Sequence, residues 1–481
     1  MKVSSIKVSI DPITRLEGHG KIDIFLDENG NVTNARVQTP ELRGFEKFCV
    51  GRKAEDMPII TARICGVCPE AHHIASAKAL DMAFGAPPPR TAHLIRELLY
   101  NAYIFYDHCL HLYYLGGIDV LLGDVEKKDR NVIGLIKKFG LELGAEIIKH
   151  RRYAMETIKM VGGREIHPVC AIPGGVSKRI KEEERKEIEE KFSKCISFAE
   201  RSIALFKEVF DSDRWNELLG LDEIKTYYMG IVDSDNRVNY YDGNIRIVSP
   251  SGKEFAKLKP NELIENIDEH IEKWNYVKYP YLKKVGWHGF VDGEKSGVYR
   301  VGPLGRINSA DGMNTPIANK EFKEFRKNGI VHKTFAYYHA RLIEMLNAAE
   351  RVYYLCQEKD ITSDDIRSMP TKTGEGIGIV EAARGVLIHH YDVDEKGLIR
   401  KVNLIVATTN NNAAINMSVA NTAKKVIKNG EVNDILLNKV ESSFRCYDPC
   451  MACASHAIGR MPTIINLYRN GELYKRLVRD A

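Results

Sequence analysis

Alternating hydrophobic and polar residues predict β-strands at two places in the chain. Residues 21–39, KIDIFLDENGNVTNARVQT, alternate on both sides of the dipeptide Asn29-Gly30. Asn-Gly between two alternating runs is a strong signal for a tight hairpin turn. Residues 240–254, YYDGNIRIVSPSGKE, show the same kind of pattern. We therefore expect a β-hairpin in each of these segments.

Longer segments repeat their hydrophobic residues every three or four positions, which predicts α-helices. The first such segment begins at Pro69 and ends at Gly85, two residues typical of helix ends. Helical spacing also covers residues 91–115, 181–210 and 320–357, the last with an interruption near Gly329. The predicted fold class is α+β and predominantly helical, a large central helical bundle with small peripheral β-hairpins or sheets. No repeat or linker marks a domain boundary.

Composition narrows the class of protein. The 481 residues carry a net charge of +5 without a dense Lys/Arg stripe, so we expect no nucleic-acid partner. The most apolar segment, residues 98–123, contains Asp107, His108 and His111, which favours a buried helix and no transmembrane segment. The first twenty residues hold no apolar run of signal-peptide length. Six of the ten cysteines lack a repeating spacing, a usage typical of a reducing compartment: Cys49, Cys109, Cys170, Cys195, Cys356 and Cys446.

Two similar cysteine motifs lie at opposite ends of the chain: RICGVCPEAHH at residues 63–73 and YDPCMACASH at residues 447–456. Two Cys-x-x-Cys pairs can supply four thiolates, and their spacing alone suggests a tetrahedral zinc site or an iron–sulfur cluster. Small structural zinc sites gather their ligands locally, whereas a site built from both chain ends lies at the centre of the fold. The residues inside the pairs, Gly-Val and Met-Ala, also indicate a buried site.

Charged residues interrupt otherwise apolar or glycine-bounded motifs at four positions: Glu17, Arg63, Arg384 and Asp448. Buried charges are costly unless they are paired or functional. If these side chains are buried, we expect them to be paired or functional, which weighs against a structural zinc site.

The two cysteine motifs, together with DPITRLEGHG at residues 11–20 and ELRGFEKF at residues 41–48, resemble the large, catalytic subunit of nickel–iron hydrogenases. The motifs occur in the order of that family, and the resemblance runs from Asp11 to His456. Over its full length the chain is most similar to the cytoplasmic, methyl-viologen-reducing type that works with a heterodisulfide reductase.

The resemblance implies a nickel–iron centre held by Cys65, Cys68, Cys450 and Cys453. The second cysteine of each pair would bridge nickel to an iron that carries cyanide and carbon monoxide, and soft thiolates suit such a centre. The first cysteine of each pair, Cys65 and Cys450, would be terminal. Glu17 matches the carboxylate that receives the proton from a terminal thiolate. The alternative is a buried glutamate paired with Arg15 or His19.

The resemblance assigns further residues to the surroundings of the metals. Arg384 matches an arginine over their open face, and Asp107 and Asp448 match the carboxylates that orient it. The alternatives are that Asp448 starts a turn and that Asp107 caps a helix kink. Ala383 stands where the family usually has proline, which changes the shape of the pocket. Thr408 matches a hydroxyl donor to cyanide.

Three histidine and carboxylate assignments follow from the same resemblance. His72 would hydrogen-bond a cysteine sulfur, while the neighbouring His73 is also explained as a satisfied core histidine. Glu46 and His456 match ligands of a separate magnesium or iron ion.

The resemblance divides the chain into a hydrogenase large-subunit domain, residues 1–456, and a C-terminal maturation peptide, residues 457–481. In the family a C-terminal endopeptidase removes this peptide after nickel-insertion proteins have loaded the metal. The alternative is an ordinary hairpin around Asn470-Gly471 that stays attached.

The electrons from hydrogen must leave through partners, because the six remaining cysteines contain no Cys-x-x-Cys pair and the chain is expected to hold no iron–sulfur cluster of its own. The resemblance implies an iron–sulfur small subunit, an electron-transfer subunit and a heterodisulfide reductase, all in the cytoplasm. A deazaflavin-reducing or NAD(P)-linked hydrogenase is an alternative, although no Gly-x-Gly-x-x-Gly run follows a predicted strand. A non-catalytic scaffold like the related complex I subunit, and a structural four-cysteine zinc protein, are alternatives of another class.

Overall fold

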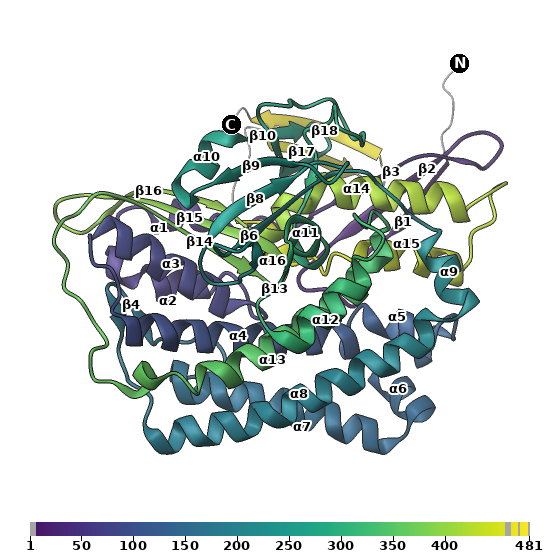
Figure 1. Ribbon diagram of the computed structural model, residues 1–481. Coiled ribbons are helices and arrows are strands. Elements are labelled where there is room, and N and C mark those ends of the chain that lie inside the picture. Colours follow the sequence, from purple (N-terminus) through teal and green to yellow (C-terminus); the bar gives the residue numbers. More distant parts are fainter. Residues whose placement is uncertain (1–5, 457–462, 470–471, 480–481) are drawn as a thin grey trace.

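The computed structural model describes residues 6–456, 463–469 and 472–479 (Figure 1). Its centre is a bundle of four long helices: α4 (Arg90–Tyr114), α7 (Leu141–Gly162), α8 (Glu182–Phe210) and α13 (Tyr337–Leu355). Helices α4 and α8 each pack against both α7 and α13. The amphipathic α8 exposes its charged face, whereas α4 is buried along most of its length. The hydrophobic pattern therefore places α4 inside the bundle.

Most of the strands lie on one side of the bundle, above it in the view of Figure 1. One antiparallel sheet has the order β1 (Ile6–Ile10), β2 (Lys21–Leu26), β3 (Val32–Gln38), and another has the order β14 (Glu375–Ala382), β15 (Gly385–Val393), β16 (Ile399–Ile405). A six-stranded sheet has the order β13 (Gly312–Met313), β7 (Arg237–Val238), β6 (Tyr227–Val232), β8 (Asn244–Val248), β9 (Glu254–Leu258), with β12 (Tyr299–Arg300) paired with β6. Three two-stranded sheets are β4 (Ala171–Ile172) with β5 (Gly175–Val176), β10 (Ile267–Glu272) with β11 (Asn275–Leu282), and β17 (Thr463–Arg469) with β18 (Glu472–Arg479).

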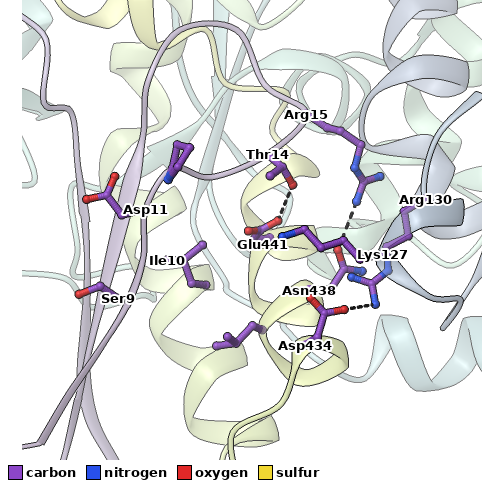
Figure 2. A pocket seen from close by; sticks show the side chains of 12 residues that line it. Ser9, Ile10, Asp11, Thr14, Arg15, Lys127, Arg130, Asp434, Asn438 and Glu441 are labelled. Carbon is purple, nitrogen blue, oxygen red and sulfur yellow. Dashed lines mark hydrogen bonds and ion pairs between the residues drawn. The ribbon is translucent and has the colours of Figure 1, made fainter.

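The other α-helices join and cover these elements. They are α1 (Phe45–Cys49), α2 (Met57–Ala62), α3 (Pro69–Ala83), α5 (Gly117–Leu122), α6 (Val132–Phe139), α9 (Asp213–Leu219), α10 (Leu263–Asn266), α11 (Gly302–Ser309), α12 (Pro316–Phe325), α14 (Ala407–Val426), α15 (Asp434–Arg445) and α16 (Met451–Ala454). A surface cleft of about 340 Å³ opens between β1, residues 127–130 and α15 (Figure 2). None of the described helices is long and apolar enough to span a bilayer.

The sheet β14–β16 lies directly against α3, because two glycines let the backbones approach. A Cβ atom added to Gly378 would lie 2.0 Å from the carbonyl oxygen of Ala75, and one added to Gly376 would lie 2.0 Å from that of Ala79. Glycine in a strand often marks such a close approach of another backbone. This sheet is therefore part of the core rather than a peripheral hairpin.

The predicted elements agree with the structure. Both hairpins form, as β2–β3 and β8–β9, and the second belongs to the six-stranded sheet. The helical segments from 69, 91 and 181 are α3, α4 and α8. The fourth is divided into α12 and α13 by a break in which Gly329 has φ 90°. The predominantly helical α+β class is confirmed.

The C-terminal segment forms a hairpin in which β17 pairs antiparallel with β18. The predicted turn at Asn470-Gly471 lies outside the described residues. Pairing of the two strands is compatible with both expectations for residues 457–481, a removable peptide and a permanent hairpin.

Candidate metal centre

The first cysteine pair precedes a rigid helix. Cys68 is the residue before α3, and the backbone N–H groups of Val67 and Cys68 point at the sulfur of Cys65, at 3.3 Å and 3.1 Å. Backbone donors and the positive end of a helix favour a thiolate over a thiol. Almost every side chain of α3 is buried. The pair is therefore held by the core itself.

The second pair has a different support. Cys450 precedes α16, a helix of only four residues, and follows Asp448, whose φ of 53° is left-handed. A left-handed non-glycine residue is strained and persists only where its surroundings hold it. Here the carbonyl oxygen of Asp448 accepts a hydrogen bond from Nε of Arg384 at 2.6 Å.

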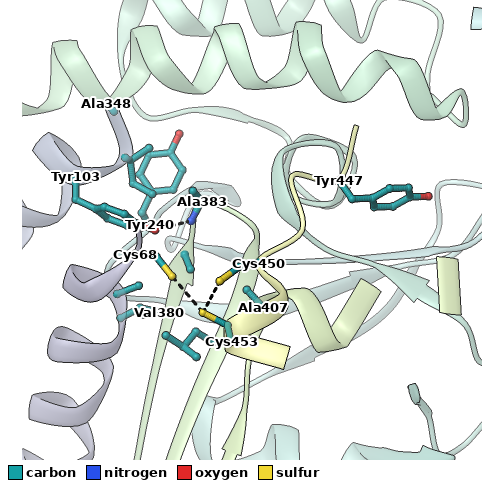
Figure 3. Close-up of a cluster of buried hydrophobic side chains, with 14 of the residues drawn as sticks. Cys68, Tyr103, Tyr240, Ala348, Val380, Ala383, Ala407, Tyr447, Cys450 and Cys453 are labelled. Carbon is teal, nitrogen blue, oxygen red and sulfur yellow. Dashed lines mark hydrogen bonds between the residues drawn. The ribbon is translucent and has the colours of Figure 1, made fainter. Parts of the chain in front are cut away.

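The four sulfurs converge in the core, and Figure 3 shows those of Cys68, Cys450 and Cys453. Cys65 Sγ lies 3.4 Å from Cys450 Sγ, Cys68 Sγ lies 3.5 Å from Cys453 Sγ, and the sulfurs of Cys450 and Cys453 are 2.7 Å apart. All four lie within 4.8 Å of one another and are buried. The two motifs from opposite ends of the sequence thus form one site, as predicted.

The four buried thiols strongly influence one another's ionisation. Burial alone would raise the pKa of Cys65, but hydrogen bonds from the other three thiols and the charge of Arg384 hold it well below its usual value. Burial and neighbouring sulfur raise the pKa of Cys450 and Cys453 well above the usual value. Like charges this close cannot all ionise without compensation, so a metal ion is needed to bring the four thiols to the thiolate form.

Glu17 lies beside the second pair. Its carbonyl oxygen accepts the N–H of Met451 at 2.9 Å, and its carboxylate oxygen Oε2 lies 2.9 Å from Cys450 Sγ and accepts the N–H of Ala452 at 3.2 Å. Burial raises the pKa of this carboxyl group, and the charge of Cys65 raises it further. A carboxyl group in this position can exchange a proton with the Cys450 sulfur.

The alternative pairing of Glu17 with Arg15 or His19 is wrong. Arg15 pairs instead with Asp119, with 2.5 Å between Nη2 and Oδ1, and His19 contacts Glu41. Glu17 is therefore free of a basic partner on its own loop, and its carboxylate faces the sulfur.

Arg384 extends from the turn between β14 and β15 and is buried. Its Nη1 donates to Asp107 at 2.9 Å, and its Nη2 lies 3.0 Å from Asp448 Oδ2. Both predicted carboxylate partners of Arg384 are therefore in place. Burial raises the pKa of Asp107 to about 6. Burial acts the same way on Asp448, but Arg384 and its neighbours hold that pKa well below its usual range.

Three other predicted residues contact the site through hydrogen bonds. The hydroxyl of Thr408 accepts the N–H of Cys450 at 3.0 Å. The imidazole Nε2 of His72 lies 3.5 Å from the sulfur of Cys453, the contact expected from the sequence. The N–H of Ala383 donates to the hydroxyl of Tyr103 at 3.2 Å, a bond that proline could not make.

Glu46 and His456 come near each other at the last turn of the described core, with 3.9 Å between Oε1 and Nε2. The backbone of Leu404 lies between them: its N–H donates to Glu46 at 2.7 Å, and its carbonyl oxygen is 2.7 Å from His456 Nε2. The sequence carries no signal for this carbonyl, because every residue has one.

Several buried groups around the site were not predicted from the sequence. Asp448 also lies 3.3 Å from Arg341 Nη1 and 3.0 Å from His111 Nδ1, and His389 Nε2 contacts His72 Nδ1 at 3.0 Å. Glu70 is buried beside the first pair, and its Oε2 has no hydrogen-bond partner among the described residues. Arg63 departs from expectation in the opposite way: it is exposed, since its backbone stands at the surface where α2 ends.

The four converging cysteines define a candidate metal-binding protein, and comparison with known proteins gives its family. The model of the nickel-dependent hydrogenase family matches residues 43–130 and 315–456, and a second model, described as HoxL-like, matches residues 7–42. The chain is 46% identical to an iron-sulfur subunit of the F420-non-reducing hydrogenase of Archaeoglobus profundus, over 98% of this chain and 99% of that one. This chain belongs to the nickel-dependent hydrogenases.

Other relatives broaden the comparison. A vhu subunit of the F420-non-reducing hydrogenase of Methanocaldococcus jannaschii is 42% identical over 88% of this chain and all of its own length. The beta subunit of the NAD-reducing hydrogenase HoxS of Cupriavidus necator is 35% identical over 96% of this chain and 97% of its own. A solved NAD+-reducing [NiFe]-hydrogenase in the H2-reduced state superposes with a TM-score of 0.89 at 36% identity, over 94% of this chain and 99% of that one.

The residues present fit a nickel–iron centre. The donor set consists of four thiolates, which nickel and iron accept readily, and a buried arginine lies beside them as a counter-charge. The carboxyl oxygen Oδ1 of Asp107 is buried without a hydrogen-bond partner among the described residues, as expected for a group that faces an additional ligand.

Proposed function

We propose that this chain is the catalytic subunit that reversibly cleaves molecular hydrogen into two protons and two electrons. The observation that supports this most strongly is the 2.9 Å contact between Glu17 and the Cys450 sulfur at the edge of the four-thiolate site. A structural zinc site or a non-catalytic scaffold has no use for a carboxyl group with a raised pKa at a ligand sulfur.

Cys65, Cys68, Cys450 and Cys453 would hold the nickel–iron centre, whose iron we expect to carry cyanide and carbon monoxide. The bound centre supplies the Lewis acidity and the redox capacity needed for heterolytic cleavage of hydrogen. The protein contributes the bases and the fixed charges around it.

Cys450 and Glu17 move the proton. The Cys450 sulfur takes up a proton and passes it to Glu17 Oε2 along the existing contact. Burial raises the pKa of Glu17 toward the working range, so the carboxyl group can both accept this proton and release it. The reverse sequence delivers a proton to the sulfur when hydrogen is formed.

Arg384 fixes positive charge over the thiolates and is positioned by Asp107 and Asp448. A guanidinium held from two sides does not reorganise during the reaction, which is the source of electrostatic stabilisation. We assign Thr408 and Ala383 to the shape and hydrogen bonding of the pocket for the iron ligands. His72 orients Cys453.

We assign Glu46, His456 and the Leu404 carbonyl to a second cation, magnesium or iron, that ties the C-terminal motif to β16. Residues 457–481 follow this site directly, and we propose that a C-terminal endopeptidase removes them after nickel-insertion proteins have loaded the metals. Mass spectrometry of the purified chain distinguishes a C-terminus at His456 from one at Ala481.

An iron–sulfur small subunit is the proposed electron acceptor, supported by the naming of the relatives as subunits of larger hydrogenases. We propose a cytoplasmic complex in which an electron-transfer subunit passes electrons to a heterodisulfide reductase, and the relatives named F420-non-reducing hydrogenases fit an acceptor other than F420. An NAD(P)-linked hydrogenase is the second candidate, favoured by the likeness to the solved NAD+-reducing enzyme. Assays of the native complex with a heterodisulfide and with NAD+ separate the two.

The direct test of the catalytic role is Glu17→Gln in the complex purified from its host. Glutamine keeps the shape but cannot exchange the proton, so hydrogen-dependent viologen reduction should fall about 10²- to 10⁴-fold. Nickel and iron contents should stay unchanged. The matched control is Glu41→Gln, which alters an exposed carboxylate partner of His19 on a neighbouring loop. Undiminished turnover in Glu17→Gln would contradict the proposed role.

A further inference from the structure

The loop that carries Glu17 contains a strained residue of its own. Arg15 has a left-handed φ of 56°, two positions before Glu17, just as Asp448 has one of 53° two positions before Cys450. The two segments pair side by side through a parallel bridge between Glu17 and Cys450. Two strained segments need anchors outside the site to hold this contact.

One buried carboxylate contacts the anchors of both segments. Asp119, on α5, accepts from Arg15 Nη2 at 2.5 Å through Oδ1 and from Arg445 Nη1 at 2.6 Å through Oδ2. Ser442 also donates to Oδ2 at 2.9 Å. Burial opposes ionisation of Asp119, but Arg445 and Arg15 lower its pKa, so it is a carboxylate.

Arg15 and Arg445 each hold a different segment of the site: Arg15 holds the loop of Glu17, and Arg445 holds the segment that leads to Cys450. Arg15 also donates to the carbonyl oxygen of Leu115 at 3.1 Å, which fixes its guanidinium. Arg445 ends α15, and its carbonyl oxygen accepts the N–H of Asp448 at 2.9 Å. Arg445 Nε further donates to the carbonyl oxygen of Thr14 at 2.9 Å, which joins the two segments directly.

We infer that Asp119 is a positioning residue that sets the distance between the Glu17 carboxylate and the Cys450 sulfur. It touches neither group and acts through Arg15 and Arg445. The inference rests on the proposed function, because the contact that it sets is the proposed path of the proton.

Two arginines line the surface cleft, and only one of them, Arg15, contacts Asp119 (Figure 2). The two can therefore be substituted as a matched pair. Arg15 lines the cleft from the Glu17 loop and reaches Asn438 at 3.2 Å. Arg130 lines the same cleft but pairs with Asp434 at 2.7 Å and with the carbonyl oxygen of Val125. Arg15→Gln breaks the ion pair with Asp119. Arg130→Gln removes an equal charge from the same cleft but leaves that ion pair intact.

The first readout is independent of hydrogen chemistry. In the metal-free protein, amide hydrogen exchange of residues 11–19 should be roughly five- to tenfold faster in Arg15→Gln than in the wild type. Arg130→Gln should leave that segment unchanged. Equal exchange rates in Arg15→Gln and the wild type would overturn the inference whatever the protein catalyses.

The second readout is turnover of the complete complex. Arg15→Gln should keep its nickel and its KM for hydrogen but lose about 10²-fold in kcat, since small misplacements of a reacting group are costly. Its solvent deuterium isotope effect should increase, because proton transfer becomes slower. Arg15→Lys, which can still reach Asp119, should recover part of the rate.

Other outcomes separate the two claims. An unchanged kcat and isotope effect in Arg15→Gln, or equal losses in Arg15→Gln and Arg130→Gln, would overturn the positioning role. A wild-type complex that cleaves no hydrogen would overturn the proposed function, and the exchange rates would then still decide whether Asp119 anchors the loop. Asp119→Asn weakens the hold on both Arg15 and Arg445, so it should speed exchange of residues 11–19 as Arg15→Gln does.

Discussion

The two cysteine pairs share a sequence motif but are supported in different ways. Cys65 and Cys68 precede α3, a helix of 15 residues that packs against β14 with its backbone almost in contact. Cys450 precedes a four-residue helix that contains Cys453, and both follow the strained Asp448. The first pair is held by close packing, and the second by buried charges. A shared spacing therefore fixes the distance between sulfurs but not the forces that hold them.

The side chains with proposed chemical roles contact the second cysteine pair. Glu17 contacts Cys450, and Arg384 contacts the carbonyl oxygen of Asp448. A left-handed residue costs roughly 1–2 kcal/mol, which the surrounding ion pairs offset. The close packing around Cys65 and Cys68 makes the site rigid. The charged groups around Cys450 and Cys453 carry the proton and the fixed positive charge. Three substitutions test this division.

The largest effect is expected for Asp448→Ala, which removes the charge that holds the second pair. Arg384 and Arg341 would then be buried without this partner, and loss of one member of a buried pair costs about 3–5 kcal/mol. Urea unfolding of the metal-free protein measures the change. Asp448→Asn, which tolerates the left-handed conformation, should lose less. A change below about 1 kcal/mol in Asp448→Ala would contradict support by charge.

A smaller effect on the free energy of unfolding, one that depends on pH, is expected at His73 of α3, the helix that follows the first cysteine pair. Its Nδ1 contacts the carbonyl oxygen of Pro58 at 3.0 Å, and its Nε2 accepts the N–H of Ala171 at 2.9 Å, so it is the satisfied core histidine expected as an alternative. Burial, together with the nearby Arg96, lowers its pKa to about 4 from 6.5. The unfolded chain therefore binds one more proton between these values.

Because of this extra proton, His73 contributes stability above pH 6.5 that is lost as the pH falls toward 4. The slope is about 1.4 kcal/mol per pH unit, or about 3 kcal/mol over the range. His73→Gln should remove this part of the acid sensitivity in unfolding curves of the metal-free protein. His288→Gln, which changes an exposed histidine, is the control. If the free energy of unfolding depends on pH with the same slope in wild type and in His73→Gln, the lowered pKa of His73 is refuted.

The smallest of the three effects is expected for Gly378→Ala. The new methyl group would meet the backbone of α3 at Ala75, and overpacking of this kind costs about 1–3 kcal/mol. The first cysteine pair should shift with the helix, which lowers nickel retention along with stability. Gly44→Ala, with no atom within 4 Å of the added methyl, is the matched control. Equal stability of the two variants would show that α3 has room to move.

The sequence was sufficient for features that depend on local pattern. Helix α3 from Pro69 and the hairpin at Asn29-Gly30 follow from neighbouring residues, and the cysteine pairs from their spacing. The family resemblance added Glu17 and Arg384, whose roles no local pattern gives.

The features of the site that the sequence did not predict depend on contacts between distant segments of the chain. His111 and Asp119 are polar residues in apolar runs, and nothing in the sequence says which loop each one supports. The carbonyl oxygen of Leu404 has no signature at all. Arg63 resembles a buried charge because its neighbours are apolar, but its position at a helix end exposes it. Tertiary placement decides such cases, not composition.

The most direct test of the central claim, that the two pairs together hold a nickel–iron centre, is the infrared spectrum of the complex purified without oxygen from its own host. Protein groups absorb weakly in the region of metal-bound cyanide and carbonyl stretches. We expect these bands in wild type and in Glu17→Gln, and their loss in Cys453→Ser, which removes a proposed ligand of the iron. Absence of the bands from wild-type protein that ends at His456 would contradict the nickel–iron centre.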